Sequence, residues 1–184
     1  MKHVKLRRMI FLALCCDLGL FTKRLIAPAA NILTDSLHIP GGVSTSFSLM
    51  FLVIAAVLTP GFFCGTLMGV VQGALAFSLG MVGSMGALSP IGYIVPGIVI
   101  DCALFLAKRL RWSEPFTMMI ANMLAAASAG LTANVLVFHL KGVPLLLYLS
   151  VAMSTGAVCG LLGAQLLQRL RPVIDAEIQK DEIV

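Results

Sequence analysis

One uncharged run constrains this chain more than any other feature of its sequence. From Ser36 to Ile100 there is no Asp, Glu, Lys or Arg, and a soluble domain of this size could not hide such a run. A membrane span needs about 20 mostly apolar residues, so the run has room for three spans. Only 11% of the 184 residues are charged, against about 25% in soluble domains. We therefore expect an integral membrane protein.

Charged residues and turn residues divide the chain into six expected spans. Thr59-Pro60-Gly61 separates the second span from the third, because proline and glycine favour a turn and the combined run is too long for one crossing. The basic stretch 108–112 ends the fourth span. The expected spans cover residues 9–27, 44–59, 62–81, 88–107, 115–138 and 143–168, and residues 172–184 form a short cytoplasmic tail. The expected fold class is an all-α integral membrane protein, a six-transmembrane-helix bundle in a single membrane domain, 1–184.

The basic residues predict the orientation of this bundle. Lysines and arginines concentrate in the short cytoplasmic loops of membrane proteins. With a cytoplasmic N-terminus, ten of the thirteen basic residues fall on the cytoplasmic side, and only Lys23, Arg24 and Lys141 fall outside. Both termini are therefore expected in the cytoplasm. The net charge of +5 follows from this topology, and with no nucleic-acid-binding motif present we expect no nucleic-acid partner.

The N-terminal stretch MKHVKLRRMIFLALCC has the basic and apolar parts of a signal peptide. We expect a retained helix instead, because no small-x-small cleavage site follows and Leu14 is a poor residue before a lipidated cysteine. All five cysteines of the chain fall within expected spans, without CxxC spacing. This pattern predicts small apolar packing residues rather than disulfides or a zinc site.

Small residues recur at four-residue spacing along three of the expected spans. Helices in lipid associate through close packing, and small residues four apart let two backbones approach. Glycines form such a stripe at Gly65, Gly69 and Gly73, and another at Gly156 and Gly160. Alanines form a third at Ala121, Ala125, Ala129 and Ala133. The stripes predict either packing within the chain or a docking face for another subunit.

Polar residues within the spans, or at their outer ends, are the candidates for a binding site, because polar groups are costly in a bilayer. Those within spans are Gln72, Asn122 and Asn134. Those toward the outer side are Tyr93, His139 and Tyr148, with Asn31, Asp35 and His38 in the loop expected after the first span. Together they predict a pocket open to the outside. Asp101 is expected either to pair with Lys108 or Arg109 or to have a functional role.

No catalytic pattern accompanies these residues. Intramembrane proteases use a serine with a histidine, paired aspartates or an HExxH helix, and none of these patterns occurs. Asp17 and Asp101 are the only carboxylates expected within spans, and an acid–base pair between them has no support. The chain also lacks a Walker A sequence. We expect no enzyme activity, no catalytic residue and no metal.

Several stretches resemble one family of transport proteins. The third span opens with P-x-x-x-x-G-x-x-x-G-x-x-x-G from Pro60, and residues 31–50 read NILTDSLHIPGGVSTSFSLM, with SPIGYIVPGIVID at 89–101. With six spans and a polar loop after the first, the chain from about residue 8 to 170 is similar to the substrate-binding S component of energy-coupling-factor (ECF) transporters. The resemblance implies a bacterial or archaeal cytoplasmic membrane protein that captures a vitamin from outside. It also implies partners, a transmembrane coupling subunit and two ATPase subunits, which use the ATP.

The resemblance also implies where the solute and the coupling subunit bind. The family's pocket is lined by the loop after helix one and the outer parts of helices four to six. Here this points to Asn31, Asp35, His38, Tyr93, Asn134, His139 and Tyr148, joined by Gln72 and Asn122 if the cavity reaches deeper. The family's first helix often docks through A-x-x-x-A. This chain departs from that pattern, leaving Cys15 and Gly19 as a looser small pair.

The substrate and the function class each have alternatives. Neutral and aromatic pocket residues suit a small heterocycle such as thiamin or its hydroxymethylpyrimidine precursor. Lys23, Arg24 or Lys141 could instead meet a carboxylate such as that of pantothenate or folate, or extend to the lipid headgroups. The competing function classes are a membrane scaffold or assembly protein and a stand-alone small-solute carrier.

Overall fold

The computed structural model describes residues 2–37, 43–59, 61, 63–80, 83–139 and 141–182, with side chains described from residue 10 to 172 except for 29–31, 33–37, 43 and 83–84 within these ranges. These described residues form an all-α fold with six α-helices. These are α1 (Lys2–Leu37), α2 (Val43–Leu58), α3 (Cys64–Ser78), α4 (Ser89–Leu110), α5 (Glu114–Ala133) and α6 (Val143–Glu182). A 3₁₀ segment, η1 (Gly83–Leu88), precedes α4, and a π-helical segment, η2 (Asn134–Phe138), ends α5.

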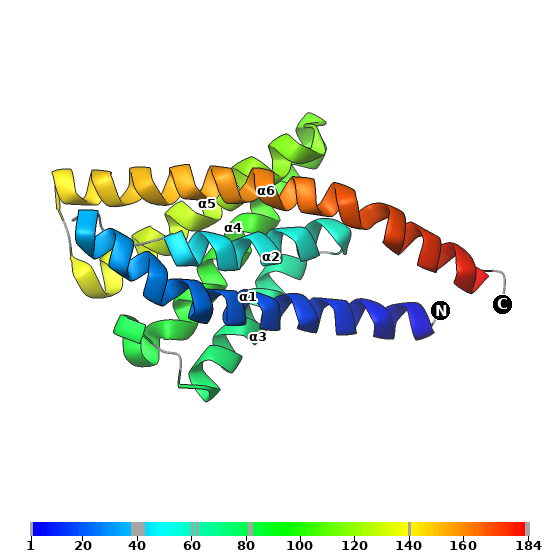
Figure 1. Ribbon diagram of the computed structural model, residues 1–184, viewed down its shortest axis with the longest axis horizontal. Coiled ribbons are helices and arrows are strands. Elements are labelled where there is room, and N and C mark those ends of the chain that lie inside the picture. Colours follow the sequence, from blue (N-terminus) through cyan, green and yellow to red (C-terminus); the bar gives the residue numbers. More distant parts are fainter. Residues whose placement is uncertain are drawn as a thin grey trace.

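Helix α2 is the central helix of the bundle. It contacts all five other helices, and in Figure 1 it lies between α1 and α6, with both chain termini at the same end of the molecule. Its middle turns are buried on every side, from Leu52 through Ala56. This helix is apolar all round, as expected of a helix enclosed by others.

The backbones of α3 and α4 approach closely because glycines face each other across the contact. A Cβ atom on Gly69 would lie 2.6 Å from the carbonyl oxygen of Tyr93, and one on Gly97 would lie 2.5 Å from that of Gly65. Helix α6 meets α5 in the same way, since a Cβ on Gly160 would lie 2.6 Å from a carbonyl oxygen of α5. The glycine stripes therefore lie in contacts within the chain.

Three helical segments are long and apolar enough to cross a membrane. They are Met85–Leu110, Glu114–Phe138 and Val143–Pro172. The helices α2 and α3 are apolar but shorter, at 16 and 15 residues. The apolar part of α1 is interrupted by Asp17, Lys23 and Arg24.

The structure differs from the sequence-based expectation at both ends of the chain. A loop was expected after the first span, but α1 continues through Pro28 to Leu37, so Asn31 and Asp35 lie on a helix. The segment 172–184 was expected to form a short tail after the sixth helix, but α6 continues through Pro172 to Glu182. In both places a polar segment extends an apolar helix, which an apolar pattern alone does not indicate.

Candidate functional site

The buried amide of Gln72 lies where α1, α2 and α3 meet. Its side chain is fully buried, and its Nε2 donates long hydrogen bonds of 3.4 Å to the carbonyl oxygen of Cys16 and to Oγ of Ser48. Gly19 leaves the room for this side chain, because a Cβ there would lie 2.7 Å from Nε2 of Gln72. The three helices thus enclose one polar group.

A second buried amide, Asn122 on α5, lies on another side of α2. Its Nδ2 donates to the carbonyl oxygen of Gly156 at 2.8 Å and to that of Ser46 at 3.3 Å. The hydroxyls of Ser46 and Thr155 lie 3.1 Å apart. Ser46 and Ser48, two residues apart on a helix, point to opposite faces. The amides of Gln72 and Asn122 therefore flank the first turns of α2.

Both amides have one oxygen without a hydrogen-bond donor. Carbonyl groups accept the bonds made by Gln72 and Asn122, so each amide nitrogen must face its carbonyl partner and each oxygen points elsewhere. Oε1 of Gln72 and Oδ1 of Asn122 are buried and unpartnered within the described part of the chain. A buried acceptor without a donor costs about 1–3 kcal/mol. Each oxygen therefore retains an unused capacity to accept a hydrogen bond.

Tyr93 lies beyond Gln72 along the α3–α4 contact and binds a lysine of α1. Nζ of Lys23 donates to the Tyr93 hydroxyl at 3.0 Å and lies 4.6 Å from the centre of its ring. The ring is almost fully buried and packs with Leu20 and Ala76. Lys23 therefore reaches into the protein rather than only outward to headgroups.

The remaining predicted residues at the end of α5 lie around η2. Asn134 is buried at the start of this segment, and its carbonyl oxygen accepts the N–H of His139 at 2.8 Å. His139 is exposed and has a left-handed backbone, with φ of 49°. The Tyr148 ring is half-buried, packs over Gly130 and lies 6.5 Å from the ring of Phe138. π-helical segments of this kind are common at functional sites.

The other predicted residues either have side chains outside the described part of the chain or are buried away from the α1 surface. The side chains of Asn31 and Asp35, and the whole of His38, lie outside the described residues. Cys15 and Gly19 are buried against neighbouring helices. The exposed face of α1 presents large apolar residues instead, including Phe21 and Leu25.

Three polar residues around the buried amides were not predicted from the sequence. Ser48 accepts a hydrogen bond from Gln72 through its hydroxyl, Ser46 accepts one from Asn122 through its backbone oxygen, and the hydroxyl of Thr155 pairs with that of Ser46. A signal for the serines was present, because VSTSFS at 43–48 places several hydroxyls at the start of an apolar span. Buried hydroxyl groups of this kind need partners, which are the amide of Gln72 for Ser48 and the hydroxyl of Thr155 for Ser46.

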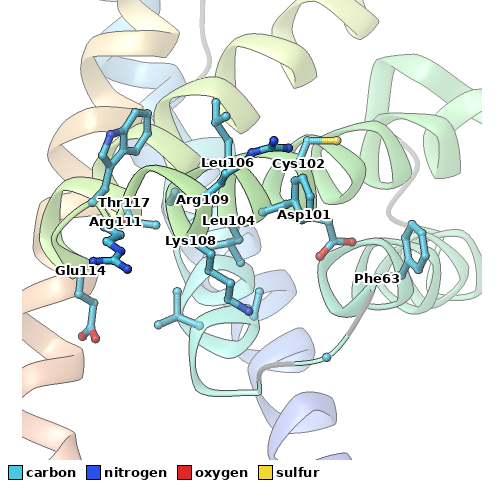
Figure 2. A pocket seen from close by; sticks show the side chains of 16 residues that line it. Phe63, Asp101, Cys102, Leu104, Leu106, Lys108, Arg109, Arg111, Glu114 and Thr117 are labelled. Atoms are coloured by element: carbon cyan, nitrogen blue, oxygen red, sulfur yellow. The ribbon is translucent and has the colours of Figure 1, made fainter.

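A cavity of about 1110 Å³ lies at a different place, where α4 ends and α5 begins (Figure 2). Its lining includes Asp101, Lys108 and Glu114 together with residues of the α2–α3 turn. None of the nine residues predicted to bind the solute lines it. Asp101 was expected either to pair with Lys108 or Arg109 or to have a functional role. Its carboxylate instead accepts hydrogen bonds from the first residues of α3.

Within the described residues, no three His, Cys, Asp or Glu side chains gather as a metal ion would require. Comparison with known proteins adds no relative to these observations, since no family model, curated protein or solved structure matches the chain.

Proposed function

We propose that this chain is the substrate-capture subunit of an ECF-type importer. In this proposal all six helices cross the membrane and both termini lie in the cytoplasm. The chain takes a small vitamin-like solute from outside and passes it through a coupling subunit driven by two ATPase subunits. The proposal rests on the resemblance of its sequence motifs to S components and on the chemistry of its buried polar groups.

The observation that supports solute capture most directly is the pair of unpartnered amide oxygens beside α2. Helix packing accounts for the hydrogen bonds that the two amide nitrogens donate, but it leaves the oxygens of Gln72 and Asn122 without a donor, which is unfavourable. Polar side chains inside membrane segments commonly mark a path or a site for a solute. Both amides contact the first turns of α2, the helix that enters the membrane from outside in the proposed topology.

The chemistry of these groups favours a neutral heterocycle with amino or N–H donors. Oε1 of Gln72 and Oδ1 of Asn122 lie on different sides of α2 and each lacks a donor. A solute bound at either oxygen must therefore supply an N–H or O–H group, as the aminopyrimidine of thiamin or of hydroxymethylpyrimidine does. Lys23 already has the Tyr93 hydroxyl and ring as partners. A carboxylate-bearing vitamin would have to replace this contact, so it is the second choice of substrate.

The surface of α1 supports a partner in the membrane. Leu14, Leu18, Phe21 and Leu25 are each about half exposed or more and recur every three or four residues, so they form one apolar face. Asp17 is exposed among them. An ionisable group facing lipid is costly, and a coupling subunit with a basic residue at that depth would remove the cost.

The scaffold alternative has one observation in its favour. Every stripe glycine from Gly65 to Gly73 and both of those in α6 pack within the chain, which a purely structural helix bundle also explains. A solute-binding measurement distinguishes the two functions, because a capture subunit binds solute and a scaffold does not. We expect thiamin or hydroxymethylpyrimidine to raise the thermal midpoint of the purified chain in detergent, with pantothenate having no effect. A midpoint unchanged by a panel of water-soluble vitamins would favour the scaffold.

A further inference from the structure

The cavity at the α4–α5 turn has a basic rim whose charge is not neutralised. Lys108, Arg109 and Arg111 line it, and within the described part of the chain none of them has an acidic partner. The two acids in the lining are already engaged. Asp101 accepts three hydrogen bonds from α3, and Glu114 forms an ion pair with Arg171. The cavity therefore attracts an anion.

The wall behind this rim is apolar. Ala56, Val57, Leu104 and Phe105 line the cavity from α2 and α4, and Figure 2 shows Leu104 and Phe63 around the space below α4, into which Lys108 also reaches. Such a cavity offers basic groups at one edge and hydrocarbon contact beyond them. This arrangement of basic and apolar groups suits an amphiphile better than a free water-soluble anion.

An aromatic anchor places this cavity at a membrane surface. Trp112 follows the basic residues at the end of a segment long enough to span a membrane, and its ring packs edge-on against Phe116 at 5.1 Å. Tryptophan concentrates at the level of lipid headgroups, as do lysine and arginine at helix ends. Basic pockets between membrane helices at this depth bind anionic lipid headgroups.

We propose that this cavity binds an anionic phospholipid, with the phosphate at Lys108 and Arg111 and the upper acyl chains against the α2 and α4 wall. The carboxylate of Asp101 is bonded to the N-terminus of α3, whose partial positive charge offsets part of its repulsion of the phosphate. The site requires only that α4 and α5 cross a membrane, so it does not depend on solute transport.

The test compares two lipids with the same acyl chains. Dioleoylphosphatidylglycerol and dioleoylphosphatidylcholine are titrated onto the purified full-length chain in detergent, and bound lipid is counted by native mass spectrometry. We expect K108Q/R111Q to weaken phosphatidylglycerol binding by about tenfold. The control K141Q/R169Q also removes two charges, but none at the cavity, and should weaken this binding by less than about twofold. Unchanged phosphatidylglycerol binding by folded K108Q/R111Q would overturn the proposal.

A second measurement needs no variant. Cys102 lines the cavity and is exposed, whereas the other four cysteines are buried. We expect phosphatidylglycerol to slow the labelling of Cys102 by N-ethylmaleimide in the unaltered chain, and phosphatidylcholine and inorganic pyrophosphate to have little effect. Equal protection by pyrophosphate would mean that the site takes a free anion, and no protection by phosphatidylglycerol would mean that it takes no lipid. Either result contradicts the proposal.

Discussion

The carboxylate of Asp101 accepts two hydrogen bonds from Thr66, one from its backbone N–H at 2.7 Å and one from its hydroxyl at 2.6 Å. A third comes from the N–H of Gly65 at 2.8 Å. The residue before α3 is Phe63, which has a left-handed backbone and provides no side-chain cap. Asp101 therefore supplies from α4 the cap that α3 lacks in its own sequence, and its negative charge lies at the positive end of the helix dipole.

Replacing Asp101 should weaken the α3–α4 contact. Asp101→Ala removes a charged acceptor of three hydrogen bonds, and we expect a loss of about 2 kcal/mol in the free energy of unfolding. Denaturant unfolding in detergent micelles measures it. Asp17→Ala, which removes an exposed carboxylate on α1, should not lower stability. Equal stability of the two variants would show that the cap contributes little.

The close approach of α3 and α4 gives a second prediction. Gly69→Ala places a methyl group 2.6 Å from the backbone oxygen of Tyr93, and backbone cannot move aside as a flexible side chain does. We expect destabilisation by about 1–3 kcal/mol, with Gly69→Leu failing to fold. Gly61→Ala is the matched control, since the nearest atom to its new methyl group lies 3.9 Å away. Thermal midpoints of the three purified variants test this, and a normal yield of folded Gly69→Leu would contradict it.

The helical architecture followed from the sequence because its signals are local. The expected span 88–107 corresponds to α4 at Ser89–Leu110, with Lys108 and Arg109 in its last turn. The cap by Asp101 could not be predicted in the same way, because it joins residues 35 and 36 positions apart. One signal pointed to it, since α3 begins at Cys64 without Ser, Thr, Asp or Asn before it, so its free N–H groups needed an acceptor from elsewhere.

The two buried amides could be identified from the sequence because polar side chains are unfavourable within apolar spans, but their contacts could not be predicted. A polar residue within an apolar span indicates that some partner exists, which singled out Gln72 and Asn122. Which helix supplies that partner depends on rotation of the helices about their axes, and the sequence pattern does not determine it. The same limit applies to Cys15 and Gly19, which were considered for docking and lie inside the bundle.

Gln72 should matter more for solute binding than for stability. Gln72→Leu loses two long hydrogen bonds of 3.4 Å and removes an unpartnered oxygen, so we expect stability to change by less than about 1 kcal/mol. Solute affinity should fall by about tenfold or more, because the variant loses one buried hydrogen bond to the solute. Asn122→Leu, which loses the 2.8 Å bond to Gly156, should lower both stability and solute affinity. Calorimetric titration and thermal unfolding measure the two effects, and a Gln72→Leu variant that is destabilised but binds normally would make Gln72 a structural residue.

The contact between Lys23 and Tyr93 should be detectable as a coupling energy. Lys23→Met loses the hydrogen bond and the ring contact, whereas Tyr93→Phe loses only the hydrogen bond. A double-mutant cycle should give a coupling of about 0.5–1.5 kcal/mol, the contribution of the hydrogen bond alone, because Tyr93→Phe keeps the ring contact. If the two substitutions are additive in thermal unfolding, Lys23 instead extends to the headgroups and leaves Tyr93 free.

Solute capture is tested most directly by native mass spectrometry of the chain purified gently from its own membranes. We expect a vitamin-sized adduct on the unaltered chain, its loss from Gln72→Leu, and ATPase subunits in the same preparation. Repeated preparations with neither an adduct nor an ATPase partner would contradict the importer proposal and favour a membrane scaffold.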